Sequence, residues 1–110
     1  MAEIQKETEQ KIAQLQLFEQ SLQNILMQKQ QFQTQVIEIE SALKELETTK
    51  EAYKIIGNIM VASKKEEIKK DLESKKEAMS LRVKTIEKQE DQIREKAKKL
   101  QEEVSKNIKE

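Results

Sequence analysis

The chain carries two long stretches in which apolar residues recur with helical spacing, separated by one short segment in which that spacing stops. In the first stretch the side chains follow one another at alternating steps of three and four residues, and Lys29 is the one polar member. The members are Leu15, Phe18, Leu22, Ile25, Lys29, Phe32, Val36, Ile39, Leu43 and Leu46. A matching series runs from Leu72 to Val104. Such steps form the contact stripe, or seam, of a coiled coil, so the pattern predicts two long helices folded back on each other.

The segment 53–62, between the two series, is typical of a β-hairpin. β-Branched and aromatic residues, which favour strands, flank the dipeptide Gly57-Asn58. Glycine accepts the positive φ that the first central position of a type II′ turn requires, and Gly-Asn is a common two-residue hairpin loop. An apolar loop that merely joins the helices is the alternative interpretation, because short apolar runs do not by themselves distinguish strand from helix.

A two-residue turn fixes which strand residues pair, and it sets Ile56 against Ile59 and Lys54 against Val61. Side chains alternate between the two faces of a strand. One face would carry Ile56, Ile59 and Val61, and the other Tyr53, Ile55, Met60 and Ala62. Both faces are then mainly apolar. Because a lone hairpin is marginally stable and exposes unpaired edges, we expect hairpins from several chains to join into a closed sheet.

The predicted fold class is mainly α: a long antiparallel two-helix coiled coil joined by one β-hairpin that oligomerises into a β-barrel. We expect a single domain with helices at residues 1–52 and 63–110 and the hairpin at residues 53–62. The run from Ser63 to Glu66 has the S-x-x-E form of a capping box, which favours a helix start at Ser63.

Folding back at the turn also sets the register between the helices, and this register aligns the two seam series. It places Leu15 opposite Leu100, Phe18 opposite Ala97, Leu22 opposite Ile93, Phe32 opposite Val83, Val36 opposite Met79 and Leu43 opposite Leu72. Two adjacent layers are polar, with Lys29 opposite Ile86 and Ile25 opposite Glu90. Either Lys29 and Glu90 reach each other and fix the register at a cost in stability, or each extends to solvent independently.

Near the two chain ends the seam loses its apolar character. Thr8, Lys11 and Asn107 occupy seam positions there. The apolar residues beside them, which we expect to be incompletely buried, are Ile4, Ile12, Val104 and Ile108. The alternative is that these residues simply close the last helical turns, since scattered apolar residues are normal on protein surfaces.

The composition narrows the possible functions. Of 110 residues, 38% are charged, and the chain has one Gly and no Pro, Cys or His, which leaves too little apolar material for a layered core and removes the commonest metal ligand and general base. The first half is acidic, the second half basic and the net charge zero, so no concentrated basic stripe is available for nucleic acid. We expect no enzymatic activity, no cofactor, no nucleic-acid or membrane partner, and a cytoplasmic location.

Two segments resemble a known family: the joint 53–61 (Tyr-Lys-Ile-Ile-Gly-Asn-Ile-Met-Val) and the second-helix segment 82–90 (Arg-Val-Lys-Thr-Ile-Glu-Lys-Gln-Glu). Both are similar to the beta-type subunits of prefoldin, particularly the archaeal ones. The resemblance implies a hexamer of two alpha-type and four beta-type subunits whose hairpins form β-barrels. It also implies a chaperone that holds unfolded polypeptides without ATP and delivers them to a group II chaperonin.

The resemblance assigns roles to both ends of the predicted coiled coil. The client-contacting residues would be Ile4, Ile12, Leu15, Leu100, Val104 and Ile108. The oligomerisation hairpin would use Tyr53, Ile55, Ile56, Gly57, Asn58, Ile59, Met60 and Val61. A structural or tethering coiled coil, in which the hairpin only turns the chain, is the competing hypothesis.

Overall fold

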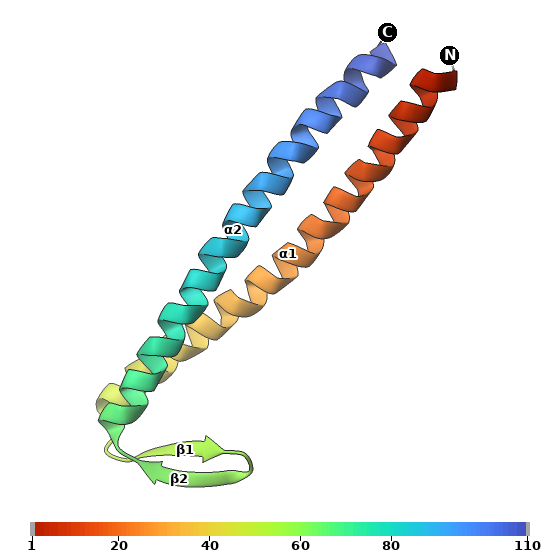
Figure 1. Cartoon of the computed structure of the whole chain (residues 1–110). Coiled ribbons are helices and arrows are strands. Elements are labelled where there is room, and N and C mark those ends of the chain that lie inside the picture. Colours follow the sequence, from red (N-terminus) through yellow and green to blue (C-terminus); the bar gives the residue numbers. More distant parts are fainter. Residues whose placement is uncertain (1, 110) are drawn as a thin grey trace. The chain divides into compact units, whose positions relative to one another are not determined.

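Two helices and one hairpin follow one another in the order α1 (Ala2–Thr48), β1 (Ala52–Ile56), β2 (Ile59–Ser63) and α2 (Lys65–Lys109) (Figure 1). This computed structural model describes the backbone from residue 2 to residue 109 and the side chains from residue 5 to residue 107. The order confirms the predicted fold, two long helices joined by one antiparallel hairpin.

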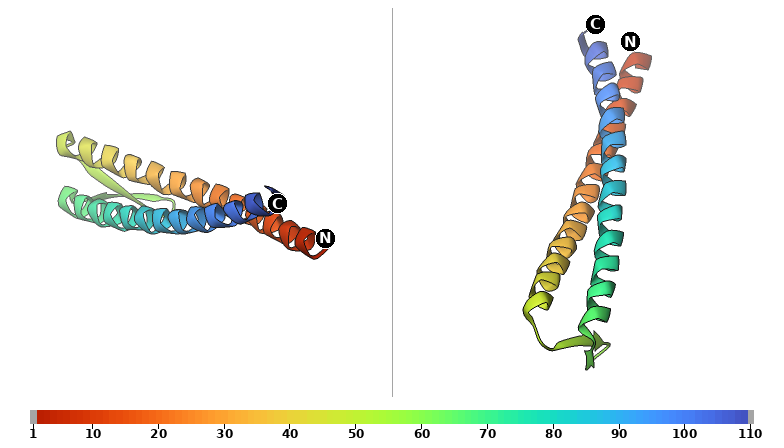
Figure 2. Two further views of the ribbon diagram at one scale, coloured as in Figure 1. Left: turned by 90° about the horizontal axis from the view of Figure 1, so that it is seen from above. Right: turned by 90° about the vertical axis from the view of Figure 1, so that its left-hand side faces the viewer.

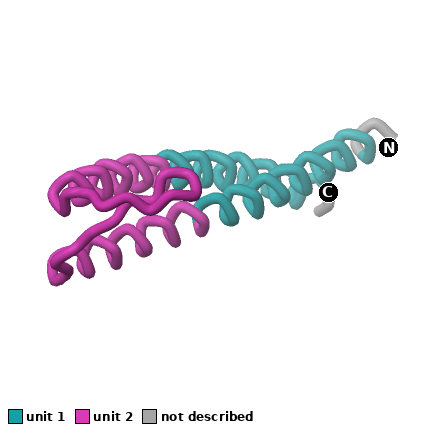
Figure 3. The backbone as a smooth tube through the Cα atoms, turned by 90° about the horizontal axis from the view of Figure 1, so that it is seen from below, with its two compact units in different colours: residues 1–29, 85–110 teal, residues 30–84 magenta. Residues whose placement is uncertain are grey.

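The chain divides into two compact units, each of which contains a segment of both helices (Figure 3). The terminal unit comprises residues 1–29 and 85–110, and the hairpin unit comprises residues 30–84. Within each unit the α1 and α2 segments run antiparallel (Figure 2).

In each unit, burial follows the predicted seam. Every member of the series from Leu15 to Leu46 is buried or half-buried, and most positions between them are exposed. The most buried side chains are Ile39 and Leu46 in the hairpin unit and Ile86 and Val104 in the terminal unit. One partner helix covers only one side of another, which explains why most seam side chains stay half-buried.

Contacts between the helices agree with the predicted register. Three of these contacts join residues within one position of the expected partner: Lys11 Nζ to Glu103 Oε2 at 3.3 Å, Lys76 Nζ to Glu40 Oε1 at 3.4 Å, and the Arg82 guanidinium at 5.5 Å from the centre of the Phe32 ring. The first lies in the terminal unit and the other two lie in the hairpin unit. The register set by the turn therefore holds within both units.

Of the two alternatives for the polar layers, the structure shows the contact between Lys29 and Glu90. Lys29 Nζ lies 3.7 Å from Glu90 Oε1, and both side chains are largely buried. The sequence pattern did not indicate a third member, Arg94, whose Nε lies 3.9 Å from the same oxygen one helical turn away. The ion pair thus occupies a seam layer where apolar side chains would otherwise pack.

Replacing Lys29 by leucine is expected to raise the melting temperature by about 4 °C, or about 1 kcal/mol, because an apolar side chain fills a seam layer without desolvating a charge. Arg94 remains beside Glu90, so that carboxylate keeps a cationic partner. Thermal unfolding followed by circular dichroism measures the change, and light scattering detects the looser register as self-association. A clear fall in melting temperature would contradict this role of the pair.

Helix α1 ends at Thr48, four residues before the expected boundary at residue 52. The hydroxyls of Thr48 and Thr49 both donate to the carbonyl oxygen of Glu45, at 3.2 and 2.9 Å, and the Thr49 N–H donates to it as well. Threonine side chains that bond to the backbone compete with helix propagation, which accounts for the early end. Lys65 Nζ then donates to the Glu47 carbonyl oxygen at 3.1 Å, a favourable place for a cation.

Helix α2 begins at Lys65, so the expected start at Ser63 is wrong. Ser63 is the last residue of β2, where it pairs with Ala52, and its backbone is therefore extended. The carbonyl of Lys64 instead accepts the N–H groups of Glu67 and Ile68, both at 3.1 Å. Acidic residues in the first turn favour this helix end because the helix dipole is positive there.

The hairpin has the predicted pairing, with Ile56 opposite Ile59 and Lys54 opposite Val61. Each strand extends one residue beyond the expected segment, to Ala52 and to Ser63. Gly57 has φ +60°, and no other described residue has a positive φ. Positive φ at the first central position alone is the pattern of a type II′ turn.

Candidate functional site

The hairpin exposes apolar side chains on both of its faces. The exposed members are Tyr53, Ile55, Ile56, Ile59, Met60 and Val61. The two strands form a sheet of their own, and its outer edges carry backbone groups that no further strand within residues 2–109 pairs. Apolar faces and open edges are the features of a sheet that other strands extend.

Tyr53 holds the one polar group on its face of the hairpin. Its hydroxyl donates a hydrogen bond to Glu51 Oε2 at 2.8 Å. This bond to the carboxylate, followed by slight desolvation, raises the pKa of Tyr53 above its usual value. The phenol therefore stays protonated at neutral pH and remains a hydrogen-bond donor at the edge of the hairpin.

In the terminal unit, the structure separates the residues expected to contact other chains. Ile12 is 39% exposed and lies off the seam as predicted, while Leu15 and Leu100 are half-buried seam residues. Ile4 and Ile108 lie outside the described side chains. The predicted client-contacting residues whose side chains are described all lie on the same antiparallel helix pair, but they are exposed to different extents.

Val104 is 7% exposed, so the expectation that it is incompletely buried is wrong. By the confirmed register it lies opposite Lys11, and Lys11 Nζ reaches Glu103, the residue before Val104. A lysine that extends across a seam covers apolar surface with its methylene stem while its charge stays in water. A polar register partner therefore does not leave Val104 exposed.

A shallow hollow in the terminal unit combines apolar and charged residues from both helices. It is lined by Gln14, Phe18, Lys96, Lys99, Leu100 and Glu103. Phe18 was not among the predicted client-contacting residues. The sequence did place Phe18 in the seam, next after Leu15, but it gave no signal that separates Phe18 from the other seam residues.

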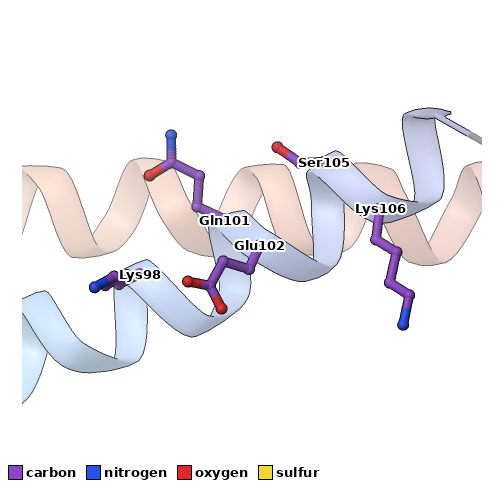
Figure 4. A pocket seen from close by; sticks show the side chains of 5 residues that line it. All are labelled: Lys98, Gln101, Glu102, Ser105 and Lys106. Carbon is purple, nitrogen blue, oxygen red and sulfur yellow. The ribbon is translucent and has the colours of Figure 1, made fainter.

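A second hollow on α2 offers no chemistry beyond polar contact. Its lining residues, Lys98, Gln101, Glu102, Ser105 and Lys106, all come from one helix, as Figure 4 shows. Among the described side chains, no group of three or more acidic residues is placed to hold a metal ion. Within the described residues, neither helix is long and apolar enough to cross a membrane.

Comparison with known proteins gives one consistent result. Residues 9–110 match the family model Prefoldin_2, described as "Prefoldin subunit". The chain is 38% identical over 98 residues to a prefoldin subunit beta of Archaeoglobus fulgidus, covering 86% of this chain and 84% of the relative. It is 32% identical over 107 residues to the prefoldin subunit beta of Pyrococcus horikoshii, covering 94% of this chain and 92% of the relative.

A solved structure has the same fold. The crystal structure of the prefoldin beta subunit from Thermococcus strain KS-1 superimposes with a TM-score of 0.86 at 29% identity. The superposition covers 91% of this chain and 90% of that chain.

Proposed function

This chain belongs to the prefoldin family of chaperone subunits, and we propose that it works as a beta-type subunit in a hexamer of two alpha-type and four beta-type chains. In this proposal the hairpins join edge to edge into β-barrels, and the terminal units bind unfolded polypeptides without ATP. The assembly acts in the cytoplasm and passes its clients to a group II chaperonin.

The exposed hairpin is the observation that carries the proposal for assembly. Six large side chains that would normally lie in a core face solvent in the single chain, from Tyr53 to Val61. Burying apolar surface contributes about 25 cal/mol per Å², and pairing an open strand edge adds backbone hydrogen bonds. The proposed oligomerisation residues are Tyr53, Ile55, Ile56, Gly57, Asn58, Ile59, Met60 and Val61.

Client binding is proposed for the terminal unit. The hollow beside Phe18 and Leu100 and the exposed Ile12 offer apolar contact without an enclosed pocket. Such contacts are weak one by one and tolerate varied sequences, but several subunits of one hexamer can hold a single client together. Leu15, Ile4 and Ile108 remain proposed contacts, and Val104 is left out because it is buried.

The molar mass of the chain, with and without an alpha-type prefoldin subunit, tests the assembly proposal. Light scattering should detect a hexamer only in the mixture. If the mass of this chain is unchanged by the alpha-type subunit, the proposal is wrong and a structural or tethering coiled coil explains the fold better. Mixing with an unrelated two-helix coiled coil of similar length is the control for unspecific association.

A further inference from the structure

Lys54 is the only charged residue in the two strands of the hairpin. The strand pairing places it on the same face as its partner Val61 and as the pair Ile56 and Ile59. The other face carries Tyr53, Ile55, Met60 and Ala62 and has no charge. Although both faces are exposed in the single chain, they differ in this respect.

The charged face is turned towards the chain's own second helix. Lys54 Nζ lies 3.4 Å from Asp71 Oδ2, in the second turn of α2, and both residues belong to the hairpin unit. Exposure alone does not separate the two faces, since Ile56 and Ile59 on the charged face are 60% and 66% exposed and Ile55 and Met60 on the other face are 69% and 65% exposed.

A closed sheet must bury one face of each hairpin and leave the other outside. Placing Lys54 inside would remove its ammonium group from water and from Asp71, and an unpaired buried charge is strongly unfavourable. Placing the uncharged face inside buries no charge of the two strands, and its one polar group, the Tyr53 hydroxyl, donates to the exposed Glu51, which precedes β1. Charge and ion pairing therefore favour the same arrangement.

We infer that the face formed by Tyr53, Ile55, Met60 and Ala62 is the surface that packs against the hairpins of neighbouring prefoldin subunits. The Lys54 face stays on the outside, beside α2 of its own chain. This assignment rests on the proposed assembly. It specifies which face of each hairpin lies in the core that the subunits share. The open strand edges identify the occupant as another strand pair rather than a helix.

Two neighbouring isoleucines provide a matched test. Ile55 and Ile56 are consecutive in β1, are 69% and 60% exposed in the single chain, and point to opposite faces. Aspartate at either position should leave the chain folded, which circular dichroism checks. Ile55→Asp should weaken assembly with the alpha-type subunit about 100-fold, because it places a carboxylate in an apolar core, and Ile56→Asp, on the outer face of the same oligomerisation hairpin, should weaken assembly about tenfold less than Ile55→Asp does.

The cross-strand partners supply an independent second pair, with Met60→Asp expected to behave like Ile55→Asp and Ile59→Asp like Ile56→Asp. Light-scattering mass over a dilution series measures all four variants. Equal effects on the two faces, or a stronger effect on the Lys54 face, would overturn the assignment. A wild-type chain that does not assemble at all would instead contradict the proposed function, so the two failures are distinguishable.

Discussion

Replacing Gly57 by valine will abolish assembly of the hairpins. Gly57 has φ +60°, and a β-branched residue held at positive φ costs about 1–3 kcal/mol. An isolated hairpin is stable by less than that, so the strands should lose their pairing and their defined faces. Sedimentation velocity of the variant with an alpha-type subunit should show dissociated or aggregated chains in place of a hexamer.

The effect should come from the backbone and not from crowding. A Cβ atom on residue 57 would meet nothing within 4 Å, so the structure has space for a side chain there. Asn58→Ser is the matched control, because residue 58 does not have a positive φ and Gly-Ser is also a common hairpin loop. A valine variant that sediments as the wild-type hexamer would show that the turn geometry is dispensable for assembly.

Removing residues 1–12 and 104–110 will abolish suppression of client aggregation while leaving the hexamer intact. The deletion removes Ile12, and it removes Lys11 and Val104 together, so no seam residue loses its partner from one side only. The hairpin unit is untouched. Because several weak contacts act together, the loss of Ile4, Ile12 and Ile108 from each beta-type subunit should lower apparent client affinity about 100-fold. Light scattering of a chemically unfolded client, without ATP, measures the change.

A point variant outside the proposed site separates client binding from general surface hydrophobicity. Leu17 is 63% exposed on α1 but belongs neither to the seam nor to the hollow at Phe18. Leu17→Gln should therefore suppress aggregation as well as the wild type. Undiminished activity of the trimmed hexamer would exclude the chain ends as the client-binding site.

The periodic parts of the fold could be predicted from the sequence, because many positions carry the same periodic pattern and support one assignment. The seam from Leu15 to Leu46 and the hairpin register were predicted and are present, and the Lys29–Glu90 contact was one of two alternatives. The helix ends at the joint were not, since they depend on single hydrogen bonds. The Thr48 and Thr49 hydroxyls end α1 early, and strand pairing takes Ser63 away from the predicted cap.

The candidate site was less predictable, because exposure depends on how all neighbouring side chains pack and not on the register partner alone. Val104 looked accessible since its register partner, Lys11, is polar, yet it is only 7% exposed. Phe18 looked like an ordinary seam residue, yet it lines a shallow hollow. The heptad position predicts the direction in which a side chain points, but it does not predict how closely the neighbouring side chains pack around it.

The hollow beside Phe18 and Leu100 also has a kinetic consequence. It is shallow and partly lined by Lys96, Lys99 and Glu103, whose long side chains are well solvated. Covering the exposed parts of one aromatic and one aliphatic side chain is worth at most about 4 kcal/mol, which corresponds to millimolar affinity for a single site. Each bound segment should therefore leave and return rapidly, so that a client escapes to any tighter-binding acceptor spontaneously, with no chemical energy needed to release it.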